Sequence, residues 1–365
     1  MKKISLCTVC MNRLQFLSKT LPVNLAENKD HAGVEFLVLD YNSGDNMEAW
    51  VRDNMSEYLE SGLLKYYKTY DPVYFHLGHS KNMIMRMATG EIIGMVDADN
   101  FAGPGYTRWV EETFRVNGPN SITTTLRKDS IPYRDQGGKL CFSKDLFHAV
   151  KGFDEELIGY GMDDVDLANR LENAGGKRVF LEEEKYLLYI GHSENERVKN
   201  YRYTNLLSNI YYKMTDSSGS GNLRTLYLFK DGTFSDMNYK FRENLKTNLV
   251  LTYHGWIVER QDGRKDGRFT QSDGMLSLLY EDGSVSKYSG YDKGLLQSVM
   301  EKDTIWKEVR KDEGMYITAV YAYGECQNRL RSVENERDPN RINEGGWGRG
   351  TVYLNFDRSR PIELR

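Results

Sequence analysis

Two groups of carboxylates in this sequence have the spacing that metal or acid–base chemistry requires. The first is Asp97 and Asp99, which stand two residues apart directly after the apolar run 92–96. Because two carboxylates that leave a strand together can face one hard cation, the pair is a candidate metal site. A divalent ion held there would offset the charge of a departing diphosphate. A solvated turn after a strand would show the same pattern, so the pair by itself leaves both interpretations open.

The second group is Asp163, Asp164 and Asp166, in the first turn of an expected helix that is apolar at Leu167 and Leu171. Carboxylates are stabilised at a helix amino terminus, so helix capping is one explanation. Three acids in four positions also repel one another, and a substrate or a cation would offset that cost. The ionised carboxylate that a helix start favours is the form that a general base needs. We therefore expect this group to be functional.

The elements that must position these acids alternate between strands and helices. Strands are predicted by the apolar runs at 4–10, 34–39, 63–67 and 92–96. The segments between them show helical spacing, and Ser80 can cap the helix before the fourth strand. Such alternation predicts a mostly parallel sheet with helices on both faces, in which ligands bind at the carboxyl ends of the strands. Asp40 and Asp97 both stand at such ends.

After about residue 215 the sequence changes character. A run of serine and glycine at 217–221 predicts a linker. Downstream, Asp-Gly pairs beginning at 231, 262, 273 and 282 punctuate runs rich in Tyr, Leu, Val and Thr, as hairpin turns do. We expect an α/β domain over 1–215 and a β-rich accessory domain over 222–365, whose role the sequence leaves open. Trp256, Trp306 and Trp347 would form either a sugar-stacking platform or an ordinary β core.

The composition limits the partners and the compartment. The 365 residues carry a formal net charge of −4, which predicts no basic surface of the kind that binds nucleic acid. Four cysteines in a chain of this length do not make a disulfide framework, and this favours a reducing compartment. No 18-residue apolar stretch is present, so we expect a cytoplasmic protein without a transmembrane segment, either free or peripheral to the inner face of the membrane.

Four segments together carry a resemblance to a known family. They are "ISLCTVCMNR", "EFLVLDYNSGDN", "HSKNMIMRMATGEIIGMVDADN" and "GGKLCFSKDLFHAVKGFDEELIGYGMDDVDLANRL". In order, they resemble the first strand, the second strand, the helix and strand before a metal-binding Asp-x-Asp, and the acceptor-side region with a G-x-[E/D]-D-x-D motif. The family is that of the family 2 glycosyltransferases with their β-galactosyltransferase and chondroitin-polymerase-like relatives. The resemblance covers roughly the first 200 residues and implies a GT-A fold, a Rossmann-like nucleotide-sugar-binding domain.

On the donor side, the resemblance implies that Asp40 contacts the nucleotide base. Cys10, Asn12 and Arg13 would line the base pocket, largely through their backbone. Lys81 would approach a phosphate of the donor, although an exposed helix lysine is an equally good interpretation of the same residue.

The resemblance also implies a metal set. Asp97 and Asp99 would hold a divalent ion against the sugar diphosphate, and His192, which follows a strand after the acidic motif, would join them. An imidazole beside two carboxylates suits Mn²⁺ better than Mg²⁺. A lone histidine after a strand is more often structural, so the assignment of His192 depends on the resemblance.

On the acceptor side, Asp164 would be the general base that removes a proton from the acceptor hydroxyl. Asp163 would bind hydroxyls of the acceptor or of the donor sugar. Gly138, the second glycine of a pair, would lie beside the donor sugar, where a side chain would obstruct close approach.

The implied function is that of a metal-dependent, inverting glycosyltransferase that moves a sugar from a nucleotide-diphosphate donor, a UDP-sugar by expectation, to a glycan or glycolipid acceptor. The sequence departs from the family at Val9, where a proline is common, and at Asp163, where the motif usually has glutamate. The shorter Asp163 leaves donor and acceptor preference open. Two alternatives remain: a retaining transferase of the same fold, and a non-catalytic carbohydrate-binding protein.

Overall fold

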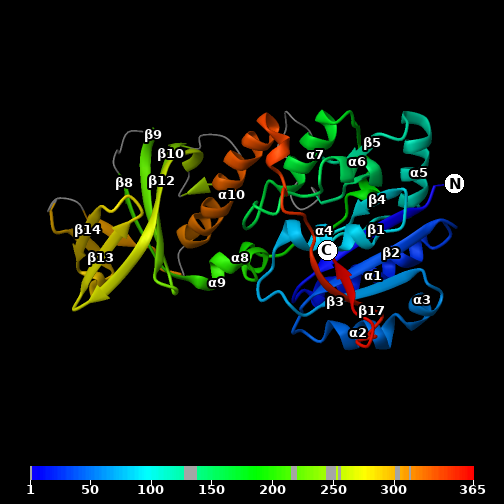
Figure 1. Cartoon of the computed structure of the whole chain (residues 1–365), viewed down its shortest axis with the longest axis horizontal. Helices are drawn as coiled ribbons and strands as arrows, with labels where there is room; N and C mark the ends of the chain where they lie inside the picture. Colours follow the sequence, from blue (N-terminus) through cyan, green and yellow to red (C-terminus); the bar gives the residue numbers. More distant parts are fainter. Residues whose placement is uncertain are drawn as a thin grey trace. The chain divides into compact units, whose positions relative to one another are not determined.

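The computed structural model describes residues 2–126, 138–214, 220–243, 252–253, 256–300, 305–311 and 314–365 (Figure 1). The chain divides into two compact units. Unit 1 contains Met1–Ser193 and Asn328–Arg365, and unit 2 contains Glu194–Gln327.

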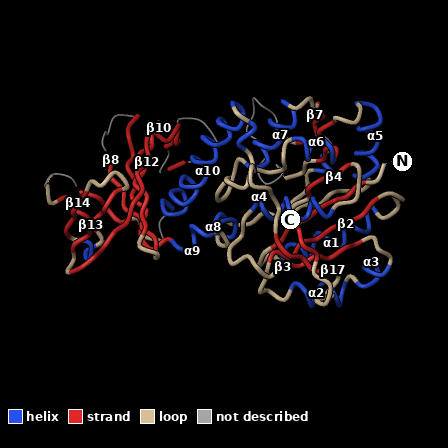
Figure 2. The backbone as a smooth tube through the Cα atoms, in the orientation of Figure 1, coloured by secondary structure: helices blue, strands red, loops and turns tan. Residues whose placement is uncertain are grey.

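Unit 1 is built on a mixed sheet with a parallel centre, and its strands and flanking helices are coloured red and blue in Figure 2. The strand order is β18-β17-β3-β2-β1-β4-β6-β5-β7. The pairs β1–β2, β1–β4, β2–β3 and β5–β7 are parallel, whereas β6, β17 and β18 join antiparallel to their neighbours. The strands are β1 (Ile4–Cys10), β2 (Val34–Tyr41), β3 (Leu64–Thr69), β4 (Ile92–Met95), β5 (Ser121–Thr124), β6 (Cys141–Ser143), β7 (Lys177–Phe180), β17 (Gly350–Leu354) and β18 (Ile362–Leu364).

Helices cover both faces of this sheet. Side chains alternate along β2, so Leu37 and Leu39 pack into one apolar cluster while Phe36 and Val38 pack into the other. The first cluster takes side chains from α4, α6 and α7, and the second from α1, α2 and α5. The helices are α1 (Leu14–Asn28), α2 (Met47–Asn54), α3 (Ser56–Glu60), α4 (Leu77–Met87), α5 (Tyr106–Asn117), α6 (Lys144–Ala149) and α7 (Asp163–Asn173). The expected mostly parallel sheet between two helical layers is confirmed.

The register of the sheet brings the predicted site residues to one edge. Cys10 pairs with Asp40 across β1 and β2, and Cys7 pairs with Met95 across β1 and β4. Because these strands are parallel, their carboxyl ends lie together, and Asp97 follows β4 at the same edge.

Helix α4 begins earlier than its sequence predicts. Its first residue is Leu77, and His76 caps it by accepting a hydrogen bond at Nδ1 from the backbone N–H of His79, at 3.3 Å. Ser80, the expected cap, lies inside the helix and donates to the carbonyl of Leu77. The N-cap side chain of α4 is therefore the imidazole of His76 and not the serine hydroxyl that capping preferences favour.

Unit 2 is dominated by an antiparallel sheet of order β10-β9-β8-β16-β15-β14-β13-β12-β11, in which β10 also pairs with β12 and so closes the sheet. The expected β-rich character of this region is confirmed. The strands are β8 (Leu207–Met214), β9 (Ser220–Phe229), β10 (Thr233–Glu243), β11 (Thr252–Tyr253), β12 (Trp256–Ser272), β13 (Met275–Tyr280), β14 (Val285–Ser289), β15 (Leu295–Ser298) and β16 (Ile305–Glu308). The helices are α8 (Glu194–Val198), α9 (Arg202–Leu206) and α10 (Gly314–Arg337), and α10 counts with unit 1 from Asn328 onward.

Three of the four Asp-Gly pairs make the expected turns. Gly232, Gly274 and Gly283 have φ values of +79°, +73° and +82° between consecutive strands. The pair at 262 is different, because it lies within β12. There Asn238 pairs with Gly263 and Tyr239 with Gln261, so one residue of β12 is skipped as in a β-bulge.

The unit boundaries differ from the expected domains 1–215 and 222–365. Unit 2 begins at Glu194, and residues from Asn328 onward return to unit 1, where β17 pairs with β3 (Figure 1). Of the serine and glycine run, 217–219 lie outside the described residues, and Ser220 and Gly221 belong to β9. The order of residues along the chain does not reveal that a later segment rejoins unit 1, because strands can pair whatever their separation in sequence.

Of the three tryptophans, two have described side chains, and these belong to different units. Trp347 lies in unit 1 and packs against Phe147 and His148, with ring centroids 5.3 and 5.4 Å away. Trp306 is buried in the core of unit 2. Trp256 begins β12, and its side chain lies outside the described residues. No helix in the described part of the chain combines the length and apolar character needed to cross a membrane.

Candidate active site

Asp97 and Asp99 leave the sheet at the carboxyl end of β4. The backbone of Val96 still pairs with Cys7 of β1, and a hydrogen bond from Asn100 N–H to the carbonyl of Asp97, at 2.9 Å, closes the turn that follows. Asp99 is 6% exposed. The turn therefore places both acids at the edge where ligands bind in sheets of this kind.

His192 lies against Asp99, 93 residues away in sequence. Its Nε2 is 2.8 Å from Asp99 Oδ2. The segment before it runs antiparallel to the Asp99 turn: Ile190 N–H donates to Asp99 carbonyl at 2.8 Å, and Phe101 N–H donates to Leu188 carbonyl at 3.0 Å. These backbone bonds, not the local sequence, carry the imidazole to the carboxylate.

The charges at this edge would be relieved by a cation. Burial raises the pKa of Asp97, and the nearby charges of Asp99 and Asp163 add to the rise against that of Lys81. Burial also acts to raise the pKa of Asp99, but the hydrogen bond with His192 and the charge of Arg13, 3.6 Å away, lower it overall.

The predicted metal set fits a divalent ion in its chemistry but is not a preformed cage. Two carboxylates and one imidazole are ligands that Mn²⁺ accepts. In the described ranges, however, no group of three or more His, Cys, Asp or Glu side chains is arranged to hold a metal ion. Asp99 and His192 are brought together as a hydrogen-bonded pair, and Asp97 joins them only as an electrostatic neighbour.

Lys139 is a buried cation that sequence reasoning missed. Its Nζ donates to the carbonyls of Phe101 at 2.5 Å, of Tyr186, and of Leu188 at 3.4 Å. Burial lowers the pKa of Lys139 to about 7, although the charges of Asp97 and Asp99 oppose the shift. The ammonium thus ties the segment after Asp99 to the segment before His192. Its only signal in the sequence is its place directly after the glycine pair.

Gly138 lies against the carboxylate of Asp97. A Cβ built on Gly138 would stand 2.0 Å from Asp97 Oδ2, closer than any real contact. A side chain at this position would therefore crowd Asp97, and the expected place of Gly138 beside the donor sugar stays a prediction. Gly137, the other member of the pair, lies outside the described residues.

Lys81 joins the acidic helix start to the rest of the site. Its Nζ is 2.6 Å from Asp163 Oδ2 and 2.7 Å from Asp164 Oδ1. The residue is 1% exposed, so the alternative of an exposed helix lysine is wrong. Its ammonium is occupied by the two carboxylates of α7, and its charge also acts on Asp97.

The acid–base properties of Asp164 suit proton transfer near neutral pH. Burial and the charge of Asp163 raise the pKa of Asp164 to about 7, and Lys81 opposes this rise. A general base works best when its pKa lies near the working pH. The helix start alone would have favoured a lower value, so burial beside Asp163 outweighs the helix dipole here.

The third acid of the cluster has a different environment. Asp166 is 1% exposed and accepts from Arg170 Nε at 2.8 Å and from Asn335 Nδ2 at 2.9 Å. Both partners are structural, so the structure separates Asp166 from the pair that faces Lys81.

The predicted base pocket is a pair of interlaced loops after β1 and β2. Asn12, in the left-handed region at φ 56°, accepts from Gly44 N–H through Oδ1 at 2.7 Å, and its own N–H donates to Ser43 Oγ at 3.0 Å. Cys10 is buried at the end of β1, and Arg13 extends towards Asp99.

Asp40 is fully buried beneath these loops. Its Oδ2 accepts from Tyr66 Oη at 2.5 Å and lies 3.0 Å from Lys68 Nζ, while Oδ1 accepts from Ser43 N–H at 2.7 Å. Both oxygens therefore have protein donors. Contact with a nucleotide base stays a prediction, and in this structure Asp40 holds the loop that would surround the base.

One known family model matches part of unit 1. Residues 119–193 match the family model described as the N-terminal domain of galactosyltransferase. This segment contains Gly138, Lys139, the acidic helix start and His192. No curated protein matches the chain.

Several solved structures are similar over about half of the chain. One is the mannosyltransferase PcManGT from Pyrobaculum calidifontis in complex with GDP-Man and Mn²⁺, at 19% identity and a TM-score of 0.41, covering 50% of this chain and 55% of that one. Another is residues 1–349 of TarS from S. aureus, at 15% identity and a TM-score of 0.41, covering 53% and 61%. A third is glucosyl-3-phosphoglycerate synthase from Mycobacterium tuberculosis, at 12% identity and a TM-score of 0.35, covering 53% and 73%. The chain spans less than two thirds of the first two structures.

The part of the chain that is similar to the N-terminal domain of galactosyltransferase, residues 119–193, therefore contains Gly138, the acidic start of α7 and His192 of the candidate site. The activity of this chain, with its sugar donor, its acceptor and the stereochemistry of transfer, is proposed below.

Proposed function

We propose that this chain is a metal-dependent, inverting glycosyltransferase that uses a nucleotide-diphosphate sugar. The observation that carries the proposal is the position of Lys81, whose ammonium binds Asp163 and Asp164 and whose charge also acts on Asp97. A single site therefore contains a candidate base at the start of α7 and carboxylates at the end of β4 that suit a diphosphate-bound cation.

Asp164 is the general base of the proposed reaction. It accepts the proton of the acceptor hydroxyl as that oxygen attacks the anomeric carbon, while the bond from that carbon to the diphosphate oxygen breaks and the nucleoside diphosphate leaves. One direct displacement inverts the anomeric configuration. Asp163, which contacts the same ammonium, would accept hydrogen bonds from sugar hydroxyls.

Asp97, Asp99 and His192 would hold Mn²⁺ or Mg²⁺, which would neutralise charge on the departing diphosphate. The chain's own residues prepare this place: Lys139 joins the two segments that carry Asp99 and His192, and Gly138 leaves Asp97 unobstructed. Arg13 adds a fixed positive charge beside Asp99.

The donor is proposed to be a UDP-sugar that enters between the loops after β1 and β2, with Cys10, Asn12 and Arg13 lining its base and Asp40 supporting the loop. Lys81 is assigned to the acidic pair in place of the donor phosphates, because both of its close partners are carboxylates. A glycan or glycolipid hydroxyl would be the acceptor, at the cytoplasmic side.

The test is a panel of nucleotide sugars titrated calorimetrically with Mn²⁺ present and absent, followed by measurement of released nucleoside diphosphate. We expect one nucleotide sugar to bind saturably only with the metal and to be hydrolysed slowly. Failure of every nucleotide sugar to bind would contradict the proposal.

Stereochemistry is tested separately once an acceptor is known. An NMR spectrum of the product that shows the anomeric configuration opposite to the donor would support inversion. Retention would replace the direct displacement with the retaining alternative while leaving the metal and donor sites in place.

A further inference from the structure

One face of α10 carries a polar stripe with a helical repeat. Asn328, Arg331 and Asn335 are three and four residues apart and therefore lie on the same side of the helix. Asn328 is 1% exposed and Asn335 is wholly buried. Leu330 and Val333, on the other side, are about half exposed. Unsatisfied polar groups are costly when buried, and the amide nitrogens of Asn328 and Asn335 both have partners.

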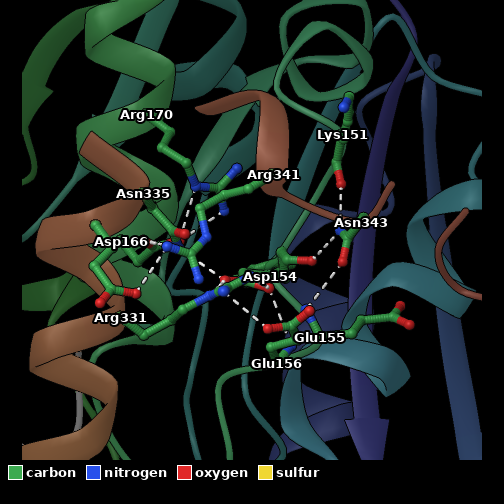
Figure 3. Close-up of polar contacts among 12 residues, drawn as sticks. Lys151, Asp154, Glu155, Glu156, Asp166, Arg170, Arg331, Asn335, Arg341 and Asn343 are labelled. Carbon is green, nitrogen blue, oxygen red and sulfur yellow. Dashed lines mark hydrogen bonds and ion pairs between the residues drawn. The ribbon is translucent and has the colours of Figure 1, made fainter. Parts of the chain in front are cut away.

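Those partners lie in the segment that leads into α7 and in the first turn of α7 itself (Figure 3). Arg331 Nε is 2.7 Å from Asp154 Oδ2, and Arg331 Nη1 is 2.8 Å from Glu156 Oε2. Asn335 Nδ2 donates to Asp154 Oδ2 at 2.8 Å and to Asp166 Oδ1 at 2.9 Å. A single amide thereby bridges two buried carboxylates that would otherwise repel each other.

The contacts of the stripe flank the two acids of the active site. Asn328 Nδ2 donates to the carbonyl of Gly161 at 2.8 Å, two residues before Asp163. Asn335 holds Asp166, two residues after Asp164. The turn between these anchors is tightly specified, because Gly161 has φ +98° and Met162 has φ +72°.

We infer that Asn328 and Asn335 are positioning residues that set the geometry of Asp163 and Asp164 against Lys81. This inference rests on the proposed function. It adds that residues of α10 from Asn328 onward, which follow unit 2 in sequence, hold the general base in position. Lys81 contacts the carboxylates of Asp163 and Asp164 directly. Helix α10 holds the backbone around this pair through the Gly161 carbonyl and the Asp166 carboxylate.

The experiment compares Asn335→Ala, Asn328→Ala and the control Glu336→Ala in the full-length chain. Glu336 is an exposed residue of α10 that accepts from Asn169 Nδ2 further along α7, so its loss removes a contact between the same helices away from the acidic turn. Asn328→Ala removes one bond to a carbonyl and leaves both buried carboxylates paired, so it serves if Asn335→Ala does not fold.

In steady-state transfer assays, we expect both asparagine variants to lower kcat by about 10- to 100-fold, because small displacements of a reacting group have effects of this size. The affinity for donor and metal, measured by calorimetry, should match that of Glu336→Ala. Asn335→Ser, which keeps one donor, should recover part of the turnover. Equal loss of donor affinity and turnover would mark a general structural role and overturn the inference.

Hydrogen exchange of the backbone amides provides a readout that does not require activity. Both asparagine variants should speed exchange over 160–166 and leave β1, β2 and β4 unchanged, whereas the control should alter neither. Unchanged exchange over 160–166 would overturn the inference even with an inactive wild type, and the proposed function would fail separately if no donor bound or reacted.

Discussion

At the scale of single residues, the site depends on how Lys81 shares its charge between two carboxylates. Asp163 and Asp164 stand on adjacent positions of α7, and one buried ammonium contacts both. The pKa of Asp164 is raised to about 7 by burial and by Asp163, and Lys81 limits that rise. The side chain can therefore exchange a proton near neutral pH, as a general base must.

Replacing Asp164 with Asn should remove the base and keep the shape of the turn. We expect transfer to fall by about 10²- to 10⁴-fold, the usual contribution of a general base, with donor binding retained. The measurements are initial rates of nucleoside diphosphate release with acceptor present and calorimetry with the donor. Asp71→Asn, in an exposed loop, is the control. Undiminished turnover of Asp164→Asn would exclude Asp164 as the base.

The pH dependence follows from the raised pKa of Asp164. A base must be deprotonated, so kcat/KM should be high above about pH 7 and fall as the pH drops through that value. Lys81→Met removes the charge that lowers this pKa, and the acidic limb of the profile should move to higher pH. Lys19→Met, on the exposed side of α1, should leave the profile in place. A limb that stays fixed in Lys81→Met would break the link between the two residues.

At the scale of elements, the edge of the sheet holds two acids, and a separate strand-like segment brings the histidine. The segment 188–190 pairs with 99–101 through backbone bonds, and Lys139 caps this pairing by donating to three carbonyls. The chain around this pairing is irregular, so some of its backbone carbonyls lack a strand partner. Lys139 supplies the hydrogen bonds that a regular sheet would have given to them.

Lys139→Met should therefore act on the metal site through the backbone. The carbonyls of Phe101 and Tyr186 would lose a donor, at a cost of about 1–3 kcal/mol for each group left unsatisfied, and the pairing of Asp99 with His192 would loosen. We expect weaker binding of Mn²⁺ in a calorimetric titration. The control is Lys185→Met, which changes a half-exposed lysine of the same segment that pairs with Glu183. Unchanged affinity for Mn²⁺ in Lys139→Met would show that the hydrogen bonds from Lys139 do not support the metal site.

At the scale of the molecule, unit 1 is made of two stretches of chain separated by the whole of unit 2. The second stretch adds β17 to the edge of the sheet, packs Trp347 on α6, and places Ile342 and Val352 in the interior, where both are wholly buried. In sequence, unit 2 therefore lies between the two stretches of unit 1.

Ile342→Ala tests whether this second stretch stabilises unit 1. Truncating a buried isoleucine costs about 2–5 kcal/mol of unfolding free energy, since the transfer term and the cavity both count. Leu330→Ala, at a half-exposed position of α10, should change stability by no more than about 0.5 kcal/mol. Urea unfolding monitored at a β1 or β2 position reports on unit 1. Equal midpoints for the two variants would show that the returning segment is only loosely attached.

The sequence by itself determined the features that depend on neighbours along the chain. The continuous apolar runs of β1, β2 and β4, the carboxylates that follow β4, and the acids in the first turn of α7 were predicted where they lie, because strand and helix periodicity are local properties. The resemblance to a family added His192, which no local pattern would have distinguished.

Tertiary structure decided everything that joins distant residues. Lys81 meets Asp164 across 83 positions, Lys139 reaches Tyr186 across 47, and Asn335 reaches Asp166 across 169. Only the fold shows that Lys81 serves the acidic pair, that Asp40 is occupied by Tyr66 and Lys68, and that the chain end completes unit 1. The physical reason is that a buried charge takes whichever partner the packing places within a few ångströms, and sequence separation carries almost no information about that choice.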